Sequence, residues 1–166
     1  MGLLLRRTPP KGMSLLELLL VLAVLSGVLA VSLPSFLNTV LPRYRLKNAA
    51  ERLVGDMLYA RALAVKTNLQ HRIVFDTNNN AYWMEVGDRS AESKTWSRKT
   101  PVARFSDAAG DVYFPGVELV EVTASALVFR PTGGQTALSV TMRDSRGQSL
   151  KIVTAMAGRI RMERLG

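Results

Sequence analysis

The chain has 166 residues, 48% of them hydrophobic, and a formal net charge of +9 at pH 7. This length fits one domain with an appendage and excludes a multidomain enzyme, while the apolar content excludes a disordered chain. The sequence has no cysteine and a single histidine, His71. Disulfides and thiolate metal sites are therefore excluded, and we predict no catalytic residue, no cofactor and no metal site.

The N-terminal segment is the most unusual part of the sequence. Residues 1–12 carry three positive charges and no acid, and a 21-residue apolar run from Met13 to Leu33 follows with one charge, Glu17. At about 1.5 Å per residue, a helix of this length spans roughly the 30 Å of a hydrocarbon core. Because the basic residues precede the run, we expect residues 1–12 to be cytoplasmic and the bulk of the chain to lie across the membrane.

Three interpretations fit such a segment. A secretory signal peptide would use Val28-Leu29-Ala30 as a weak cleavage site, although Glu17 and the length of the run count against it. A plain signal anchor is the simplest alternative. In the third interpretation a basic leader ends at Gly12, a membrane peptidase cuts after it, and Glu17 is the fifth residue beyond the cut.

The third arrangement resembles the class III signal of type IV prepilins and pseudopilins. The usual pattern begins with Gly and an apolar residue, most often Phe. Ser or Thr comes next, followed by two apolar residues and Glu. Here Met13 stands in place of the Phe, and Ser14-Leu15-Leu16-Glu17 follow. The resemblance implies that a prepilin peptidase cleaves between Gly12 and Met13 and methylates the new N-terminus of Met13.

Glu17 has a physical role under this interpretation. An unpaired carboxylate in a bilayer costs at least about 2.5–3.5 kcal/mol. Cleavage after Gly12 creates an amine on Met13 that could pair with Glu17 of a neighbouring subunit, so assembly would relieve the cost. The alternative is a glutamate close enough to the membrane interface to reach water.

The rest of the N-terminal half predicts a long helix over about 13–66. Proline removes a backbone hydrogen bond, so we expect a bend or local melting at Pro34 and Pro42. After Pro42 the pattern becomes amphipathic and ends at Thr67-Asn68. The expected apolar face comprises Leu46, Ala50, Leu53, Met57, Leu58, Leu63 and Ala64.

From Gln70 onward the hydrophobic period changes to two, which indicates strands. Residues 78–80 are three asparagines and predict a hairpin turn, whereas 87–99 is polar and predicts a mobile loop. The predicted strands are 72–75, 82–86, 101–105, 112–114, 117–122, 127–130, 137–143, 150–155 and 159–163. The fold class is α+β: a long N-terminal helix, membrane-spanning in its first half, and a small antiparallel β-domain of seven to nine strands.

The C-terminal half carries a second resemblance. The segment Leu127-Val128-Phe129-Arg130-Pro131-Thr132-Gly133-Gly134, followed by Leu150–Val153 and by Gly158-Arg159-Ile160-Arg161, resembles the GspH/FimT family. Its members are minor pseudopilins of type II secretion and minor pilins of type IV pili.

The two resemblances imply a pilin-like organisation. Residues 1–12 would be a cytoplasmic leader, 13–41 the transmembrane and assembly half of the helix, and 42–166 a periplasmic globular domain. The protein would be anchored in the inner membrane and would contact lipid, the prepilin peptidase, other major and minor pseudopilins and the inner-membrane assembly platform. It would be a non-enzymatic subunit of the pseudopilus that drives protein export.

The basic C-terminus suggests an alternative function. Residues 143–166 carry a net charge of +4, and a strand over 159–163 would project Arg159 and Arg161 from one face while Ile160 and Met162 point inward. Paired guanidinium groups suit phosphate contacts. Some FimT-type minor pilins bind DNA through a Gly-Arg-x-Arg motif, which Gly158–Arg161 matches; the simpler explanation is a solvated strand face or a contact with acidic subunits.

Overall fold

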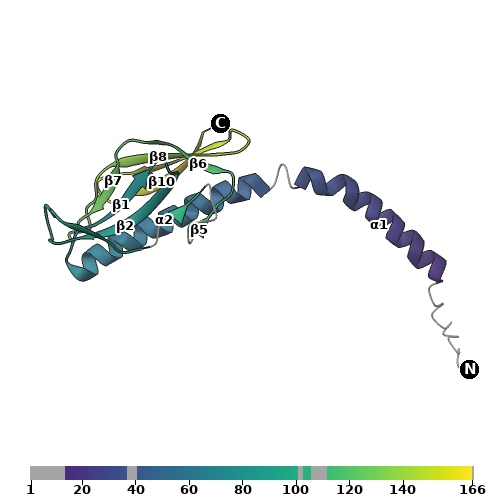
Figure 1. Ribbon diagram of the computed structural model, residues 1–166, viewed down its shortest axis with the longest axis horizontal. Coiled ribbons are helices and arrows are strands. Elements are labelled where there is room, and N and C mark those ends of the chain that lie inside the picture. Colours follow the sequence, from purple (N-terminus) through teal and green to yellow (C-terminus); the bar gives the residue numbers. More distant parts are fainter. Residues whose placement is uncertain (1–13, 37–40, 101–102, 106–111, 166) are drawn as a thin grey trace, which may run out of the picture. The chain divides into compact units, whose positions relative to one another are not determined.

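A computed structural model describes residues 14–36, 41–100, 103–105 and 112–165 of the chain. Contacts divide it into two compact units, Met1–Asn38 and Thr39–Gly166. The described part of the first unit is a single helix. The second unit is a helix packed on two β-sheets (Figure 1).

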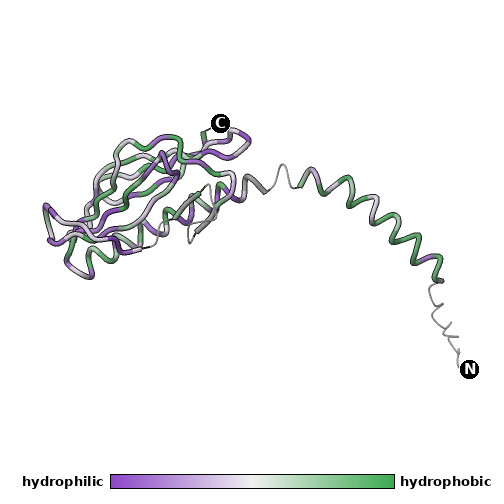
Figure 2. The backbone as a smooth tube through the Cα atoms, in the orientation of Figure 1, coloured by the Kyte–Doolittle hydropathy of each residue, from purple (hydrophilic) through white to green (hydrophobic). Residues whose placement is uncertain are grey.

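Helix α1 (Leu15–Ser35) consists almost entirely of apolar residues, which colour its tube mostly green in Figure 2. It starts after Ser14, whose carbonyl accepts a 3.1 Å hydrogen bond from the Leu18 N–H. The one hydroxyl in mid-helix, on Ser26, donates to the Ala23 carbonyl at 2.9 Å and so needs no external partner. The span Leu15–Pro34 has a mean hydropathy of 2.5 and is long and apolar enough to cross a membrane by length and composition.

Helix α2 (Leu41–Thr67) buries one face against the sheets. The buried residues recur every three or four positions, and alanines among them let the helix approach the sheets closely. Leu58 was expected on this face but is 51% exposed, because its position falls on the solvent side of the helix. The helix ends at Thr67, followed by Asn68 in the left-handed conformation at φ 55°. Its buried residues are Leu46, Ala49, Ala50, Leu53, Met57, Ala60 and Ala64.

The two prolines occupy different positions in these helices. Pro34 lies inside the last turn of α1, and Pro42 is the second residue of α2, where a missing N–H has no intrahelical partner to lose. Residues 37–40, between α1 and α2, lie outside the described residues. The bend predicted at Pro34 and Pro42 therefore stays a prediction.

The first sheet is built on the predicted hairpin of β1 (His71–Asp76) and β2 (Ala81–Gly87). Asp76 stabilises the turn, because its carboxylate accepts hydrogen bonds from the backbone N–H and the side-chain amide of Asn79 at 3.0 and 2.7 Å. Asn80 then takes the positive φ of 49° that the turn requires.

The other strands of this sheet lie on both sides of the hairpin. The order is β5-β4-β2-β1-β7, and β3 also pairs with β2. The segment predicted as a loop over 87–99 thus contains a strand at its end, and β4 and β5 pair in parallel where an antiparallel domain was expected. The bounds are β3 Trp96–Arg98, β4 Ala103–Arg104, β5 Val112–Tyr113 and β7 Ala126–Phe129.

The second sheet is a four-stranded antiparallel sheet in the order β10-β9-β8-β6. Its strands are β6 (Val117–Val122), β8 (Leu138–Asp144), β9 (Ser149–Thr154) and β10 (Ile160–Leu165). The described residues form ten strands where seven to nine were expected. The additional strand is β3, which has three residues and is too short to show a period-two pattern.

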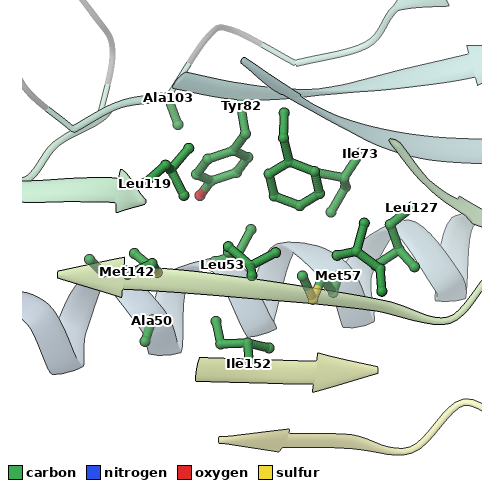
Figure 3. Packing of buried hydrophobic residues seen from close by; sticks show 14 of the residues in the cluster. Ala50, Leu53, Met57, Ile73, Tyr82, Ala103, Leu119, Leu127, Met142 and Ile152 are labelled. Carbon is green, nitrogen blue, oxygen red and sulfur yellow. The ribbon is translucent and has the colours of Figure 1, made fainter. Parts of the chain in front are cut away.

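The hydrophobic core lies between α2 and the two sheets. In Figure 3 Ile73, Tyr82 and Leu127 of the first sheet point toward Leu53 and Met57 of α2. Met142 and Ile152 of the second sheet, both fully buried, complete the same cluster. The side chain of Asn80 joins the sheets directly: its amide donates to the Val117 carbonyl at 2.9 Å, and its oxygen accepts from the Leu119 N–H at 2.6 Å.

Candidate functional site

Glu17 is the only charged residue of α1 and lies in its first turn. The large apolar side chains that flank it, Leu15, Leu16 and Leu18, are between 50% and 75% exposed. A carboxylate in the first turn has a favourable interaction with the helix dipole. Gly12 and Met13, the predicted cleavage site, lie outside the described residues.

The basic C-terminal motif lies in the turn of the β9–β10 hairpin and at the beginning of β10. Gly158 is in the turn at φ 88°, Arg159 immediately precedes β10, and Arg161 is the second residue of the strand. Both arginines are exposed. Both arginines were predicted to lie in a strand over 159–163. In the structure Arg161 lies within β10, whereas Arg159 lies just before it.

The inward orientation expected for Met162 is wrong. Ile160 is half-buried against the core, but Met162 is 47% exposed. The reason is the position of β10 at the outer edge of its sheet, since helix α2 packs mainly on β6, β8 and β9 there. Alternation along a strand determines which residues share a face, but not whether anything covers that face.

A residue in the middle of α2 holds this hairpin. Nη1 of Arg61 in α2 donates a 3.0 Å hydrogen bond to the Gly158 carbonyl. A Cβ on Gly158 would overlap the guanidinium group, and Gly133 of the neighbouring turn also lies next to it. Arg61 therefore binds the Gly158 turn and lies beside the Gly133 turn, and these two turns carry the family-like motifs in the sequence.

A second contact between these turns comes from Gln135, which is fully buried. Its side-chain amide donates to the Ala155 carbonyl at 3.0 Å, and its backbone N–H donates to the Met156 carbonyl at 3.3 Å. The C-terminal hairpin is thus held from the helix side by Arg61 and from the 131–134 turn by Gln135.

The first sheet carries a cluster of charged and aromatic side chains that sequence reasoning missed. Arg72 on β1 contacts Glu85 on β2 at 2.6 Å, and the Trp83 indole N–H donates to the other oxygen of Glu85 at 2.7 Å. The Arg72 guanidinium also lies 4.2 Å from the ring centroid of Trp96. Burial raises the pKa of Glu85, but the hydrogen bonds from Trp83 and Arg72 outweigh it and leave that pKa below the usual value.

A third polar cluster joins α2 to β2. The hydroxyl of Tyr82 donates to Asp56 at 2.8 Å, and Nε of Arg52 donates to the same oxygen at 3.2 Å. Burial of Tyr82, together with the nearby Asp56 charge, raises the pKa of this tyrosine strongly. The cluster allows a buried aromatic ring to keep its hydroxyl hydrogen-bonded.

None of these clusters resembles a catalytic or metal centre. His71 is buried in β1 with Nδ1 3.2 Å from the Leu69 carbonyl, and burial lowers its pKa. Across the described residues, no group of three or more His, Asp or Glu side chains gathers to hold a metal ion. The arrangement offers surfaces and one apolar helix rather than reactive groups.

An apolar helix followed by an amphipathic helix packed on antiparallel sheets is the architecture of a pilin-like subunit. The sequence profile of the family described as Type II transport protein GspH matches residues 49–158. The chain therefore belongs to the GspH family of type II secretion pseudopilins, which are structural subunits rather than enzymes. This membership confirms the predicted family, the pilin-like α+β fold and the non-enzymatic class.

Solved structures support the same fold. One structure of the minor pseudopilin EpsH from the type 2 secretion system of Vibrio cholerae superposes with a TM-score of 0.54 at 12% identity, covering 72% of this chain and 97% of that one. A second EpsH crystal structure gives 0.55 at 11% identity, covering 74% and 95%. Among curated proteins, none matches this sequence. At such low identity the structural likeness concerns the fold alone.

Proposed function

We propose that this protein is a minor pseudopilin that is processed after Gly12, methylated on Met13 and assembled into a type II secretion pseudopilus. The observation that carries the proposal is Glu17: a single carboxylate in the first turn of a helix that otherwise consists almost entirely of apolar residues. In a lone subunit in lipid, this carboxylate has no cation to pair with along α1.

Cleavage between Gly12 and Met13 would provide the missing cation. The new amine would begin the chain four residues before Glu17. It would lie within reach of Glu17 of an adjacent, axially shifted copy or relative. Because a buried charge without a partner is costly, each added subunit would stabilise the one before it. Assembly would thus be coupled to processing.

The proposed location and partners follow from this scheme. The basic leader would remain in the cytoplasm, α1 would anchor the precursor in the inner membrane, and residues 42–166 would face the periplasm. Membership of the pseudopilin family implies association with other pseudopilins. Beyond that we propose contacts with the prepilin peptidase, the inner-membrane assembly platform and membrane lipid.

The decisive experiment is mass analysis of the N-terminus of the chain extracted from membranes. We expect a chain that starts at N-methylated Met13. A Gly12→Arg variant should retain the leader in full, which controls for nonspecific trimming. A start at Met1 or one near Val31 in the parent chain would overturn the proposed processing, because the latter is the product of a signal peptidase.

A second candidate function is DNA binding for uptake by a FimT-like minor pilin. The observation that favours it is the exposure of both Arg159 and Arg161 next to the rigidly held Gly158 turn. Among the described residues, neither arginine forms an ion pair. Such a site would contact phosphates, so binding would depend on salt rather than on base sequence.

A further inference from the structure

The outer edge of the second sheet is a strand without a partner on one side. Within the described part of the chain, β10 pairs only with β9. Residues 161–165 are all exposed, including Met162 at 47% and Leu165 at 43%. An edge strand of six residues offers a row of unpaired backbone N–H and C=O groups, which is a template for another strand.

The hydrogen bonds of the hairpin determine which backbone groups are free. The Ala155 N–H donates to the Arg159 carbonyl at 2.9 Å, and Arg161 lies opposite Val153. In an antiparallel pair, hydrogen-bonded and non-hydrogen-bonded positions alternate. The backbone groups of residues 159, 161 and 163 therefore point toward β9, and those of Ile160, Met162 and Arg164 point to the free edge.

This alternation limits how a second copy of β10 could pair with the first. In an antiparallel arrangement around a two-fold axis, matching hydrogen bonds require the axis to pass at a residue and not between two residues. Like charges directly opposite each other destabilise a strand pair. The register centred at 160 places Arg159 of one copy opposite Arg161 of the other. Registers centred at 161, 163 and 164 place Arg161, Glu163 and Arg164, respectively, opposite the same residue of the other copy.

The register centred at Met162 is different. It places Arg161 of each copy opposite Glu163 of the other, at a non-hydrogen-bonded position where side chains approach most closely. It also places Ile160 opposite Arg164, and Arg159 opposite Leu165, so no two like charges face each other. Within the described residues neither Arg161 nor Glu163 has an ion-pair partner in its own chain.

We propose that two copies of this protein associate through antiparallel pairing of β10 with β10, centred on Met162 and fixed by two reciprocal Arg161–Glu163 pairs. The two sheets would then form one continuous eight-stranded sheet. Helix α2 packs mainly on β6, β8 and β9 of this sheet, so it leaves the β10 edge open to an added strand. This association requires neither cleavage after Gly12 nor incorporation into a filament.

The absence of native cysteine makes the register directly measurable by disulfide formation. The full chain in detergent micelles would carry one cysteine, as Met162→Cys, Ile160→Cys or Arg164→Cys, and would be oxidised and analysed on a non-reducing gel. Opposed hydrogen-bonded residues have Cα atoms about 5.5 Å apart, within the range that a disulfide bridges. We expect Met162→Cys to form a dimer alone, and Ile160→Cys and Arg164→Cys to do so only when mixed.

Two results would overturn the proposal. Failure of Met162→Cys to dimerise, in a variant whose tryptophan fluorescence shows a folded domain, would mean that the edge is not paired with a second copy. Equal dimerisation of Met162→Cys and of Arg164→Cys alone would mean that helix α1 or random collision brings the chains together without the proposed register.

Charge exchange tests the proposed pairs independently. In the Met162→Cys background, Arg161→Glu or Glu163→Arg alone places like charges opposite each other, and we expect at least a fivefold loss of dimer. The double variant Arg161→Glu/Glu163→Arg should restore it. Glu121→Arg, a charge reversal at an exposed position of β6, is the matched control and should change little. If the double variant stays monomeric, the ionic register is refuted.

Discussion

Arg61 and Gly158 are 97 residues apart in the sequence, yet the Arg61 guanidinium donates a 3.0 Å hydrogen bond to the Gly158 carbonyl. Two features require glycine at position 158. Its φ of 88° is unfavourable for a residue with a side chain, and a Cβ would occupy the space of the guanidinium. The contact ties the middle of α2 to the hairpin that ends in β10. It therefore determines where the basic C-terminal strand lies on the domain.

Gly158→Ala should destabilise the domain by both effects. The positive φ costs about 1–2 kcal/mol, and displacement of Arg61 loses a charged hydrogen bond worth about 1.5–3 kcal/mol. Gly147→Ala isolates the first effect, because Gly147 has a φ of 83° and open space around its Cβ position. Urea unfolding followed by the fluorescence of Trp83 and Trp96 would measure both variants.

The same pair predicts non-additivity. Arg61→Ala should lower the free energy of unfolding clearly in the parent chain but only slightly in the Gly158→Ala background, since the hydrogen bond is already lost there. Additive losses would show that Arg61 contributes through its packing and not through the Gly158 carbonyl.

Gly55→Ala, at an exposed helical position with open space, should instead stabilise the domain by about 0.5–1 kcal/mol.

Tyr82 predicts a loss of stability at high pH. The folded pKa of Tyr82 lies above the ordinary value of 10.0. The neutral hydroxyl therefore contributes fully to the stability of the fold below that pH, and this contribution is lost as the pH rises above it. The loss has a limiting slope of about 1.4 kcal/mol per pH unit. We expect Tyr82→Phe to remove this slope and to cost about 0.5–1.5 kcal/mol at pH 7, where the Asp56 hydrogen bond is lost.

The control for Tyr82→Phe is Tyr59→Phe, since Tyr59 is 56% exposed. Urea unfolding at several pH values between about 8 and 11 would compare the two variants with the parent chain. If the stability of the parent chain did not fall relative to that of Tyr82→Phe as the pH rises, the role assigned to the buried hydroxyl would be contradicted.

Glu85 predicts the opposite trend in acid. Its folded pKa lies below the ordinary 4.5, so its stabilising contribution is present above that pH and is lost as the pH falls through the folded pKa. Glu85→Gln keeps an acceptor for Trp83 but loses the ion pair with Arg72. We expect this variant to be less stable than the parent at pH 7, and the difference in stability to shrink as the pH falls below 4.5, in urea unfolding followed by fluorescence. Glu121→Gln, at an exposed position, is the matched control.

Glu17 tests the assembly scheme. Glu17→Gln should be inserted and cleaved normally, because it removes a charge from the lipid, but its incorporation into filaments should fall by at least tenfold. Glu17→Asp, which keeps the charge, should recover part of the incorporation. The measurement is the fraction of processed chain recovered in sheared filaments. Normal incorporation of the glutamine variant would rule out the pairing with a neighbouring amine.

The DNA-binding alternative has its own outcome. If Arg159 and Arg161 hold phosphates, the full chain in detergent should shift duplex DNA at 50 mM salt and lose affinity steeply by 200 mM. Arg159→Ala/Arg161→Ala should abolish the shift, whereas Arg45→Ala/Lys66→Ala, an equal loss of charge from exposed positions on α2, should not. The proposed β10 pairing, by contrast, involves Glu163 and does not require Arg159.

Much of the fold could be predicted from local patterns. The apolar run after Met13 predicts α1, and three- and four-residue spacings predict the buried face of α2 from Leu46 to Ala64. The asparagines before Ala81 predict the β1–β2 hairpin. These signals are local, because helix and strand periods repeat within a few residues.

Strand β3 and the side-chain clusters could not be predicted in this way. Strand β3 has three residues, too few to show alternation, so its segment reads as a loop. The Arg72–Glu85–Trp83 cluster depends on the register between β1 and β2, and the Trp96 contact depends on β3. No residue in the sequence indicates which strand will lie beside which.

The apolar helix, the position of Glu17 in it and the arginines near the C-terminus can be read from the amino-acid sequence, because each is a matter of composition and spacing along one segment. By contrast, the contact of Arg61 with Gly158, the exposure of Met162 and the free edge of β10 among the described residues emerge only from the folded arrangement. These depend on the order of strands in the sheet and on which strands α2 covers. Both are chosen by the burial of the whole core, and contacts between distant segments leave no periodic trace in either segment alone.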